Sequence, residues 1–312
     1  MNILLFGKGG QVGWELQRSL SVLGTITALD HDSTEHCGDF ANTAGVAETV
    51  RTLRPDVIVN AAAHTAVDRA ESEADFARTL NATTPGAIAL EAAKLGAWLV
   101  HYSTDYVFDG SGSRPWVETD TPAPLSVYGR TKLEGEQLIA QACPKHLILR
   151  TSWVYAARGG NFAKTMLRLA QERDRLTVID DQWGAPTGAD LLADVTAHAL
   201  RHLQQRPQDA GLYHCVAAGE ANWNEYAKFV IAKAQQAQPA IKIKANEVAP
   251  VPTSAFPTPA VRPHNSRLHT GKLQTTFGLQ MPHWQAGVAR MLAEVLLSLI
   301  HISEPTRPER IS

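Results

Sequence analysis

The chain has 312 residues, of which 44% are hydrophobic and 19% are charged, and its formal net charge is −2. This length is sufficient for a large buried core, and the composition is that of a globular protein rather than a disordered or membrane-spanning one. The weak net charge excludes a global basic field that would recruit nucleic acid or an anionic membrane. Cys37, Cys143 and Cys215 include no CxxC pair, which argues against a disulfide framework and is typical of a reducing cytosol. We therefore expect a cytoplasmic protein without nucleic-acid or membrane partners.

The first half of the chain alternates between short apolar strands and helical patterns. Strands are expected at Asn2–Phe6, Thr25–Asp30, Asp56–Ala61, Trp98–Tyr102 and His146–Thr151, and helices at Gln11–Leu23, Val46–Leu53, Ala74–Leu95 (interrupted near Pro85) and around residues 126–136. Uninterrupted apolar strands separated by helices are typical of a parallel sheet that is covered on both faces. The pattern predicts a doubly wound α/β fold, with a Rossmann domain over residues 1–152 and ligands at the carboxyl ends of its strands.

Residues 153–297 show a looser pattern and are expected to form mainly a smaller α/β substrate-binding lobe, although residues around 185–218 are expected to return to the Rossmann domain. The predicted elements are helices at Asn161–Arg173, Ala189–Leu203 and Asn222–Gln236 and strands at Leu176–Asp180 and Leu212–Val216. Five prolines between Pro250 and Pro263 predict an extended loop there. The last helix is expected to end near Leu299, and we interpret residues 298–312 as a disordered or artificial tail outside the fold.

The segment GKGGQVG follows the first strand and opens the first helix. Gly7 permits a tight turn, Gly10 lets the backbone approach a pyrophosphate, and Gly13 allows close packing of helix and strand. Gln11 and Val12 lie in the first turn of that helix, whose free N–H groups and partial positive charge attract phosphate. The G-x-x-G-x-x-G spacing in a strand–turn–helix context predicts dinucleotide binding.

An acidic residue ends the second predicted strand. Asp30 stands where a carboxylate would hydrogen-bond the adenosine ribose, and a carboxylate there would repel the 2′-phosphate of NADP. A carboxylate there favours NAD, although Lys8 of the nearby glycine segment could partly offset the repulsion, and Asp30 could instead be only a strand-end turn residue. The cofactor is therefore expected to be NADPH or NADH.

Two further segments extend the predicted dinucleotide site. Asp39 and Phe40 are expected to flank the adenine. Ala63, His64 and Thr65 follow the third strand within a run of small residues, which allows close approach of the cofactor. Tight helix–sheet packing is an alternative explanation for the alanines of this run.

The candidate catalytic residues follow the fourth strand. Thr104 comes at the carboxyl end of that strand, and Tyr128 and Lys132 are four residues apart on the next helix, so they share one helix face. A Y-x-x-x-K pair is more often an ordinary helix surface, but in a Rossmann fold these three residues converge beside the nicotinamide. The Lys132 ammonium is expected to lower the pKa of Tyr128 from about 10 and to hold the nicotinamide ribose.

The chain resembles the dTDP-4-dehydrorhamnose reductases, extended short-chain dehydrogenases/reductases of bacterial dTDP-L-rhamnose synthesis. The resemblance covers nearly all of residues 1–297 and is carried by GKGGQVG, VNAAAHTAVDRAE, HYSTDYVF, VYGRTKLEGE, RTSWVY, NFAKTMLRLA, GAPTGADLLAD and PTPAVRPHNSRL. It implies that Thr104, Tyr128 and Lys132 are catalytic, with Tyr128 as the proton donor. It also implies hydride transfer from NADPH or NADH to C4 of dTDP-4-dehydro-β-L-rhamnose, and sugar-nucleotide contacts from Thr104, Asp105 and Trp153.

Some members of this family are described as magnesium-dependent dimers that use acidic side chains. Glu15 and Asp190 match two of those side chains in character, whereas Leu292 is apolar where a third is expected and Glu294 is displaced. The resemblance therefore leaves Mg²⁺ binding and a homodimer open.

Alternatives to these assignments remain. A nucleotide-sugar epimerase or dehydratase would share the fold, but dehydratases commonly carry T-D-E where this chain has Thr104-Asp105-Tyr106. A non-catalytic regulatory subunit that binds the dinucleotide is a second alternative, against which the intact Thr104, Tyr128 and Lys132 count. Trp153 could be a core residue that joins the two lobes.

Overall fold

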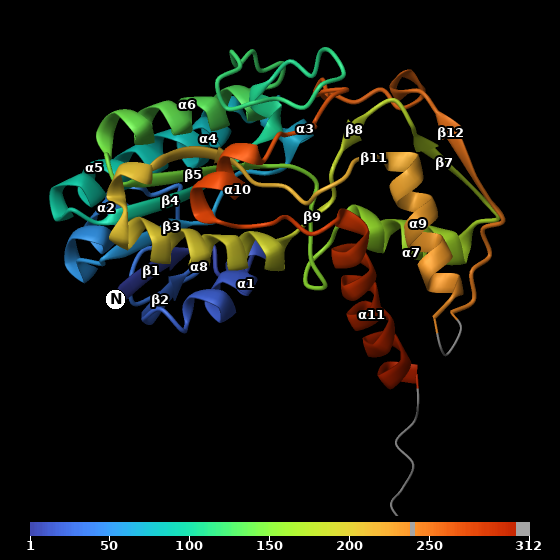
Figure 1. The fold of residues 1–312 in the computed structure, drawn as a ribbon, viewed down its shortest axis with the longest axis horizontal. Coiled ribbons are helices and arrows are strands. Elements are labelled where there is room, and N and C mark those ends of the chain that lie inside the picture. Colours follow the sequence, from blue (N-terminus) through green and yellow to red (C-terminus); the bar gives the residue numbers. More distant parts are fainter. Residues whose placement is uncertain (238–240, 304–312) are drawn as a thin grey trace, which may run out of the picture.

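Six parallel strands form the central sheet of the computed structural model, which describes residues 1–237 and 241–303 (Figure 1). Their order across the sheet is β10-β5-β4-β3-β1-β2. The strands are β1 (Asn2–Phe6), β2 (Thr25–Leu29), β3 (Val57–Asn60), β4 (Trp98–Thr104), β5 (His146–Thr151) and β10 (Gly211–His214). Because the order reverses between β1 and β3, the carboxyl ends of these strands are where a doubly wound fold binds its ligand. The predicted fold class is confirmed.

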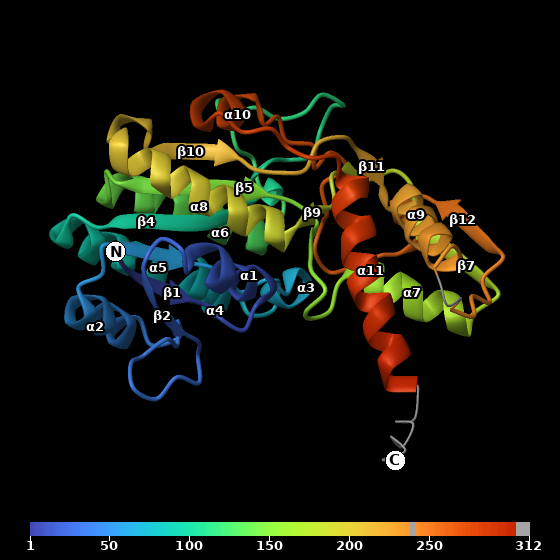
Figure 2. The same ribbon diagram turned by 60° about the horizontal axis from the view of Figure 1, so that its bottom comes forward.

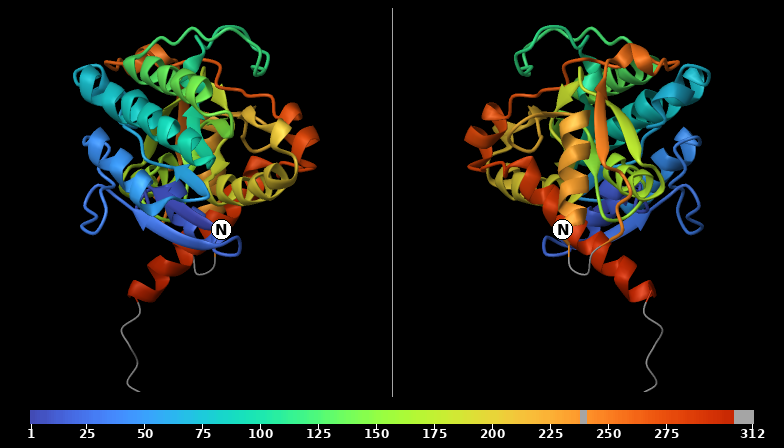
Figure 3. Two further views of the ribbon diagram at one scale, coloured as in Figure 1. Left: turned by 90° about the vertical axis from the view of Figure 1, so that its left-hand side faces the viewer. Right: turned by 90° about the vertical axis from the view of Figure 1, so that its right-hand side faces the viewer.

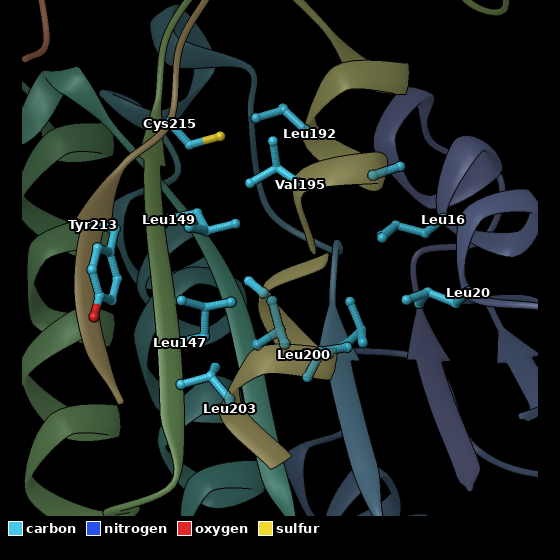
Figure 4. Close-up of a cluster of buried hydrophobic side chains, with 14 of the residues drawn as sticks. Leu16, Leu20, Leu147, Leu149, Leu192, Val195, Leu200, Leu203, Tyr213 and Cys215 are labelled. Atoms are coloured by element: carbon cyan, nitrogen blue, oxygen red, sulfur yellow. The ribbon is translucent and has the colours of Figure 1, made fainter. Parts of the chain in front are cut away.

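Helices cover both faces of this sheet (Figure 2). One face packs against α1 (Gln11–Leu20), α8 (Ala189–Gln205) and α10 (Gly271–Phe277), and the other against α2 (Thr43–Leu53), α5 (Thr84–Leu95) and α6 (Val127–Ala142). On the first face, buried leucines of α8 lie between those of α1 and those of β5 in one cluster (Figure 4). The segments α8 and β10 therefore lie with the first sheet, as does α10, which the sequence pattern did not indicate. The domain boundary at residue 152 stays a prediction.

The helical segment before β4 continues through Pro85 instead of breaking there. It consists of α4 (Ala74–Arg78), a π-helical turn (Thr79–Thr83) and α5, in which Pro85 occupies the first turn, where no backbone N–H is needed. Asn81, inside the π-helical turn, accepts a hydrogen bond from His64 N at 2.8 Å and donates to Thr131 Oγ1 at 3.1 Å. The turn thus ties the loop after β3 to α6.

The second lobe has its own hydrophobic core, to the right in Figure 1. Its main elements are α7 (Phe162–Glu172), β7 (Arg175–Ile179), α9 (Trp223–Gln235), β12 (Glu247–Val251) and α11 (Trp284–Ser303). The remaining short elements are α3 (Val67–Ala70), β6 (Val154–Tyr155), β8 (Trp183–Gly184), β9 (Thr187–Gly188) and β11 (Ala221–Asn222).

One sequence expectation for this lobe holds in part and another is wrong. The proline-rich segment is an extended loop from Pro252 on, but Pro250 and Val251 end strand β12, which pairs in parallel with β7. Pro250 is tolerated there because each strand of a two-stranded sheet is an edge. The last helix does not end near Leu299 but continues to Ser303, and it projects from the rest of the chain (Figure 3). Residues 304–312 of the expected tail lie outside the described residues.

Helix α6 is fastened to the sheet by a buried ion pair. Arg150 of β5 donates from Nε and Nη2 to the two carboxylate oxygens of Glu136 at 2.8 and 2.6 Å, and both side chains are 4% exposed. Close backbone contact supports the pair, because a Cβ at Gly129 would collide with Tyr106 O and one at Gly135 with Asn81 O. The helix therefore has one defined position over the carboxyl ends of β4 and β5.

We predict that Glu136→Ala lowers the free energy of unfolding by about 3–5 kcal/mol, because it leaves the Arg150 guanidinium buried without its partner. The matched control is Glu134→Ala on the same helix, which removes a more exposed ion pair with Arg78 and should cost less than about 1 kcal/mol. Urea denaturation of both variants measures the difference. Equal effects would show that the buried pair does not anchor the helix.

Candidate active site

In the glycine turn after β1, the fold requires a glycine at two positions but not at a third. Gly7 has a φ of +83°, and a Cβ there would lie 2.8 Å from the Ala61 carbonyl carbon. A Cβ at Gly13 would collide with Gly7 O. At Gly10, in contrast, a Cβ would meet only Gly7 O at an ordinary 3.4 Å. The protein itself does not need a glycine at position 10, which supports the predicted close approach of a pyrophosphate.

The helix that follows this turn offers unpaired donors. Gly10 is the N-cap of α1 with an extended backbone, it has no side chain to cap the helix, and the first turn contains no acidic residue. The N–H groups that begin with Gln11 and Val12 are therefore free to bind an anion, and the helix dipole favours one there. Gln11 Oε1 accepts a hydrogen bond from Asn161 Nδ2 at 3.3 Å, so the second lobe contacts the turn.

Asp30 supports the turn directly. Its Oδ2 accepts a hydrogen bond from Gly9 N at 2.9 Å, and its Oδ1 accepts one from His31 N at 3.1 Å. Lys8 turns its ammonium toward Ser33 Oγ at 3.5 Å. Asp30 therefore stabilises the turn. Its carboxylate oxygens also lie at the end of β2, where the predicted ribose contact requires them.

Of the two residues predicted to flank the adenine, Phe40 turns its side chain away from the predicted site. The Phe40 ring is buried and packs edge-to-face on Phe6 at 5.3 Å, so it faces the core rather than a ligand. Asp39 accepts a hydrogen bond from Ala41 N at 2.9 Å. Their contact with adenine stays a prediction, and it would have to come from Asp39 or from the backbone.

The loop after β3 is held in place by Asn81 of the π-helical turn. Asn81 hydrogen-bonds both the N–H and the C=O of His64, and the buried His64 ring packs edge-to-face on Phe76. Ala63 is half-buried and Thr65 is exposed at the same edge of the sheet. The loop thus presents small residues beside the glycine turn, as close approach of a cofactor would require.

Thr104, Tyr128 and Lys132 gather at the carboxyl end of β4. Thr104 is the last residue of the strand, and its Oγ1 accepts from Tyr106 N at 3.1 Å and donates to Asp105 Oδ1 at 3.2 Å. Burial raises the pKa of Tyr128 to about 12, and hydrogen bonding by the Thr104 hydroxyl opposes the rise. The phenol is therefore protonated at neutral pH and can serve as an acid.

Lys132 does not act on Tyr128 as the sequence suggested. Its Nζ donates to Tyr102 O at 2.6 Å and lies 3.2 Å from His101 Nε2, and burial lowers the pKa of the ammonium to about 8. The expected lowering of the Tyr128 pKa is wrong for this conformation, because burial of the phenol outweighs any favourable charge. His101 and its partner Asn60 were not predicted as site residues, because their signal in the sequence is only a polar side chain inside an apolar strand.

Asp105 is a buried carboxyl group beside this cluster. Burial raises its pKa to about 7, with hydrogen bonding by Ser266 and Thr104 opposing the rise. Its Oδ2 is buried and has no hydrogen-bond partner among the described residues. The same is true of the hydroxyls of Ser103, Thr151 and Ser152 on the adjoining strand ends. Such groups are candidates for polar contact with a ligand, and the substrate role of Asp105 stays a prediction.

Trp153 follows β5 and packs on the core of the second lobe. Its φ of +50° is unusual for a residue with a side chain, and its ring stacks on Trp223 with centroids 3.6 Å apart. Gly184 packs against the indole so closely that a Cβ would lie 2.8 Å from it. This geometry fits the alternative reading of a core tryptophan, while substrate contact through the remaining edge stays a prediction.

The acidic residues considered for Mg²⁺ meet in one cavity but are already paired. Glu15, Asp190 and Glu294 all line it. Arg18 lies 3.3 Å from Glu15, and Arg290 lies 3.8 Å from Asp190 and 3.5 Å from Glu294. Among the described residues, no group of three or more His, Cys, Asp or Glu is arranged to hold a metal ion. The arginine pairing does not fit a divalent cation, and no step is assigned to one.

Comparison with known proteins identifies the family. A family profile described as the RmlD substrate binding domain matches residues 1–297. The dTDP-4-dehydrorhamnose reductase of Shigella flexneri is 63% identical over 295 residues, which cover 95% of this chain and 98% of that protein. The enzyme of the same name from Escherichia coli strain K12 is 62% identical with the same coverage. The chain belongs to the dTDP-4-dehydrorhamnose reductase family.

Solved structures of this reductase family have the same fold. The protein from Clostridium acetobutylicum has a TM-score of 0.86 and 35% identity, covering 95% of this chain and all of that one. The protein from Bacillus anthracis, solved in complex with NADP, has a TM-score of 0.84 and 35% identity over 94% and 99% of the two chains. A UDP-glucose 4-epimerase from Thermus thermophilus, at 19% identity and a TM-score of 0.75, shares the fold alone. No helix that the structure describes is both long and apolar enough to cross a membrane.

We predict that Gly10→Ala weakens NADPH binding without destabilising the protein, because the added methyl has room in the protein but stands where a pyrophosphate would approach. Gly13→Ala is the matched variant and should instead lower the melting temperature, since its methyl would collide with Gly7 O. Fluorescence titration with NADPH and thermal unfolding measure the two effects. If Gly10→Ala binds NADPH as tightly as the parent, the pyrophosphate lies elsewhere.

We predict that Asp30→Ala weakens NADH more than NADPH, by about tenfold in the ratio of dissociation constants, because it removes one charge-assisted hydrogen bond to the ribose. Asp30→Asn separates the two functions of this residue, since its amide oxygen can still accept from Gly9 N while the charge is lost. It should retain stability and shift preference toward NADPH. Parallel titrations with both cofactors decide, and an unchanged ratio in both variants would mean that Asp30 serves the turn alone.

Proposed function

We propose that this protein reduces the C4 ketone of dTDP-4-dehydro-β-L-rhamnose to dTDP-L-rhamnose, with NADPH or NADH as the hydride donor. The observation that carries the proposal is the 62–63% identity to proteins named dTDP-4-dehydrorhamnose reductase over 95% of the chain. Residues that would hold the dinucleotide are those of the glycine turn and Asp30, and the structural relative in complex with NADP supports such a cofactor. The cofactor supplies the hydride to the carbonyl carbon.

Tyr128 is the proton donor in this proposal. Reduction leaves a negative charge on the substrate oxygen, and a phenol with a pKa of about 12 remains protonated until that charge develops. Thr104, whose hydroxyl lies beside Tyr128, orients the same oxygen. Lys132 holds the nicotinamide ribose through its amino group, and Asp105 and Trp153 contact the sugar nucleotide.

The alternative functions have weaker support. The match to an epimerase is confined to the fold. A regulatory subunit would not need a buried tyrosine whose pKa keeps it protonated beside Thr104. The reductase reading is therefore favoured over both.

The proposal extends to the setting of the enzyme. Its cysteines Cys37, Cys143 and Cys215 are free thiols, which supports a cytoplasmic location. The proposed division assigns residues 1–152 to a Rossmann domain, to which segments around 185–218 return, and the rest of residues 153–297 mainly to a substrate lobe. Two separate hydrophobic cores support it, since α8 and β10 contribute to the first core, although α10 does so as well. A homodimer is proposed from the family resemblance alone.

We predict that Tyr128→Phe lowers kcat by roughly 10²–10⁴-fold, because it removes the general acid while keeping the ring that packs on Tyr106. Lys132→Ala should weaken NADPH binding as well as lower kcat, since it also removes a ribose contact. The assay follows NADPH oxidation with the dTDP-4-keto-sugar, beside NADPH titration by fluorescence.

The control for this prediction is Tyr106→Phe, because Tyr106 packs edge-to-face on Tyr128 but has no assigned part in proton transfer. It should retain kcat within a few-fold. If Tyr128→Phe is equally active, another group donates the proton. If the parent protein binds NADPH but never turns over the keto-sugar, the proposed reaction is wrong.

A further inference from the structure

A buried chain of hydrogen bonds leads from the backbone after β3 to Lys132. Ala62 N donates to Asn60 Oδ1 at 3.0 Å, and Asn60 Nδ2 lies 3.0 Å from His101 Nδ1. His101 Nε2 in turn lies 3.2 Å from Lys132 Nζ. Asn60 and His101 are each 1% exposed, so water does not compete for these groups.

The direction of this chain is fixed at its backbone end. A backbone N–H can only donate, so Asn60 must turn its amide oxygen to Ala62 and its NH₂ group to His101. His101 therefore accepts at Nδ1, and a neutral imidazole that accepts at one nitrogen carries its proton on the other. The Nε2–H of His101 consequently points at Lys132.

This arrangement discriminates between the two forms of Lys132. An ammonium group has donors only, so a charged Lys132 would face the His101 N–H donor to donor. A neutral amine has a lone pair that accepts from His101, while one of its own N–H bonds still donates to Tyr102 O at 2.6 Å. A protonated His101 is not an alternative to this arrangement, because burial and then the nearby Lys132 charge hold the pKa of His101 well below its usual range.

We propose that Asn60 and His101 are positioning residues that favour the neutral form of Lys132 and thereby set the pH at which Lys132 takes up its proton. The inference rests on the proposed function, in which Lys132 binds the nicotinamide ribose, and it adds that the charged form does so because an ammonium can donate to both ribose hydroxyls while it keeps its bond to Tyr102 O. Binding of the ribose by the charged form then takes one proton from solvent to Nζ, and His101 keeps its own.

The other titratable groups around Lys132 do not account for its protonation in place of Asn60 and His101. Burial lowers the pKa of Lys132, and Glu136, one turn further along α6, opposes that effect. Both oxygens of Glu136, however, are engaged by Arg150 of β5. Tyr128, one turn earlier, is protonated and uncharged at neutral pH, and Asp105 lies beyond Thr104. From the π-helical turn, the side chain that contacts α6 is the uncharged Asn81.

The test changes which group donates in the hydrogen bonds between Asn60, His101 and Lys132. Asn60→Asp places an acceptor oxygen where the NH₂ group stood, so His101 would donate from Nδ1 and accept the Lys132 ammonium at Nε2. His101→Ala removes the N–H that faces Lys132 and puts no other donor in its place. NADPH dissociation constants are measured by fluorescence between about pH 6 and pH 10, where the affinity of the parent protein should fall as Lys132 loses its proton. In both variants this fall should move to higher pH by about one unit or more.

Two controls identify the titrating group. Lys132→Met should abolish the fall in affinity. His202→Gln removes an imidazole of α8 that is paired with Asp209, and it should leave the fall in affinity unchanged. Thermal unfolding shows which variants are folded, and His101→Ala alone decides if Asn60→Asp does not fold. A fall that stays at the parental pH in folded His101→Ala, or the absence of any fall in the parent, overturns the inference. Because the readout is binding, failure of the keto-sugar assay is a separate outcome.

Discussion

The buried ion pair between Arg150 and Glu136 is the contact on which the site geometry depends. It joins β5 to α6, and α6 carries Tyr128, Lys132 and Glu136 at successive four-residue intervals on one face. A buried pair of this kind adds little net stability, but it strongly disfavours positions of the helix in which either charge lacks its partner. Its value here is therefore positional, since it fixes the phenol and the amine relative to the end of β4.

Small residues make this placement sterically feasible. Gly129 and Gly135 let α6 approach the backbone of Tyr106 and Asn81, and Asn81 in turn holds the loop after β3 through both backbone groups of His64. The loop after β3 and helix α6 thus share one buried support. A π-helical turn places Asn81 there, which accords with the frequent occurrence of such turns at functional sites.

Burial also determines the chemistry that the side chains can perform. It raises the pKa values of Tyr128 and Asp105 and lowers that of Lys132, so each group is pushed toward its uncharged form. A phenol that stays protonated suits the reducing direction, in which the enzyme must give a proton to the new alkoxide. Some polar groups at the strand ends, including the hydroxyls of Ser103 and Thr151, have no hydrogen-bond partner among residues 1–237 and 241–303, so a polar sugar nucleotide could contact them.

Local sequence patterns were sufficient to predict most of the sheet, the glycine turn and the placement of Tyr128 and Lys132 on one helix face. These features follow from local rules: apolar runs form buried strands, the spacing of Gly7, Gly10 and Gly13 is typical of a turn that can bind phosphate, and residues four apart share a face. The motif segments also indicated the family, because together they span nearly the whole chain.

Only the tertiary structure decided what each of these residues faces. It turned the Phe40 ring into the core, stacked Trp153 on Trp223, and paired Glu15 and Asp190 with arginines. It also set the sign of the Tyr128 pKa shift and brought Asn60 and His101 to Lys132. The physical reason is that burial and hydrogen-bond direction arise from contacts between residues far apart in the chain, which no local pattern encodes.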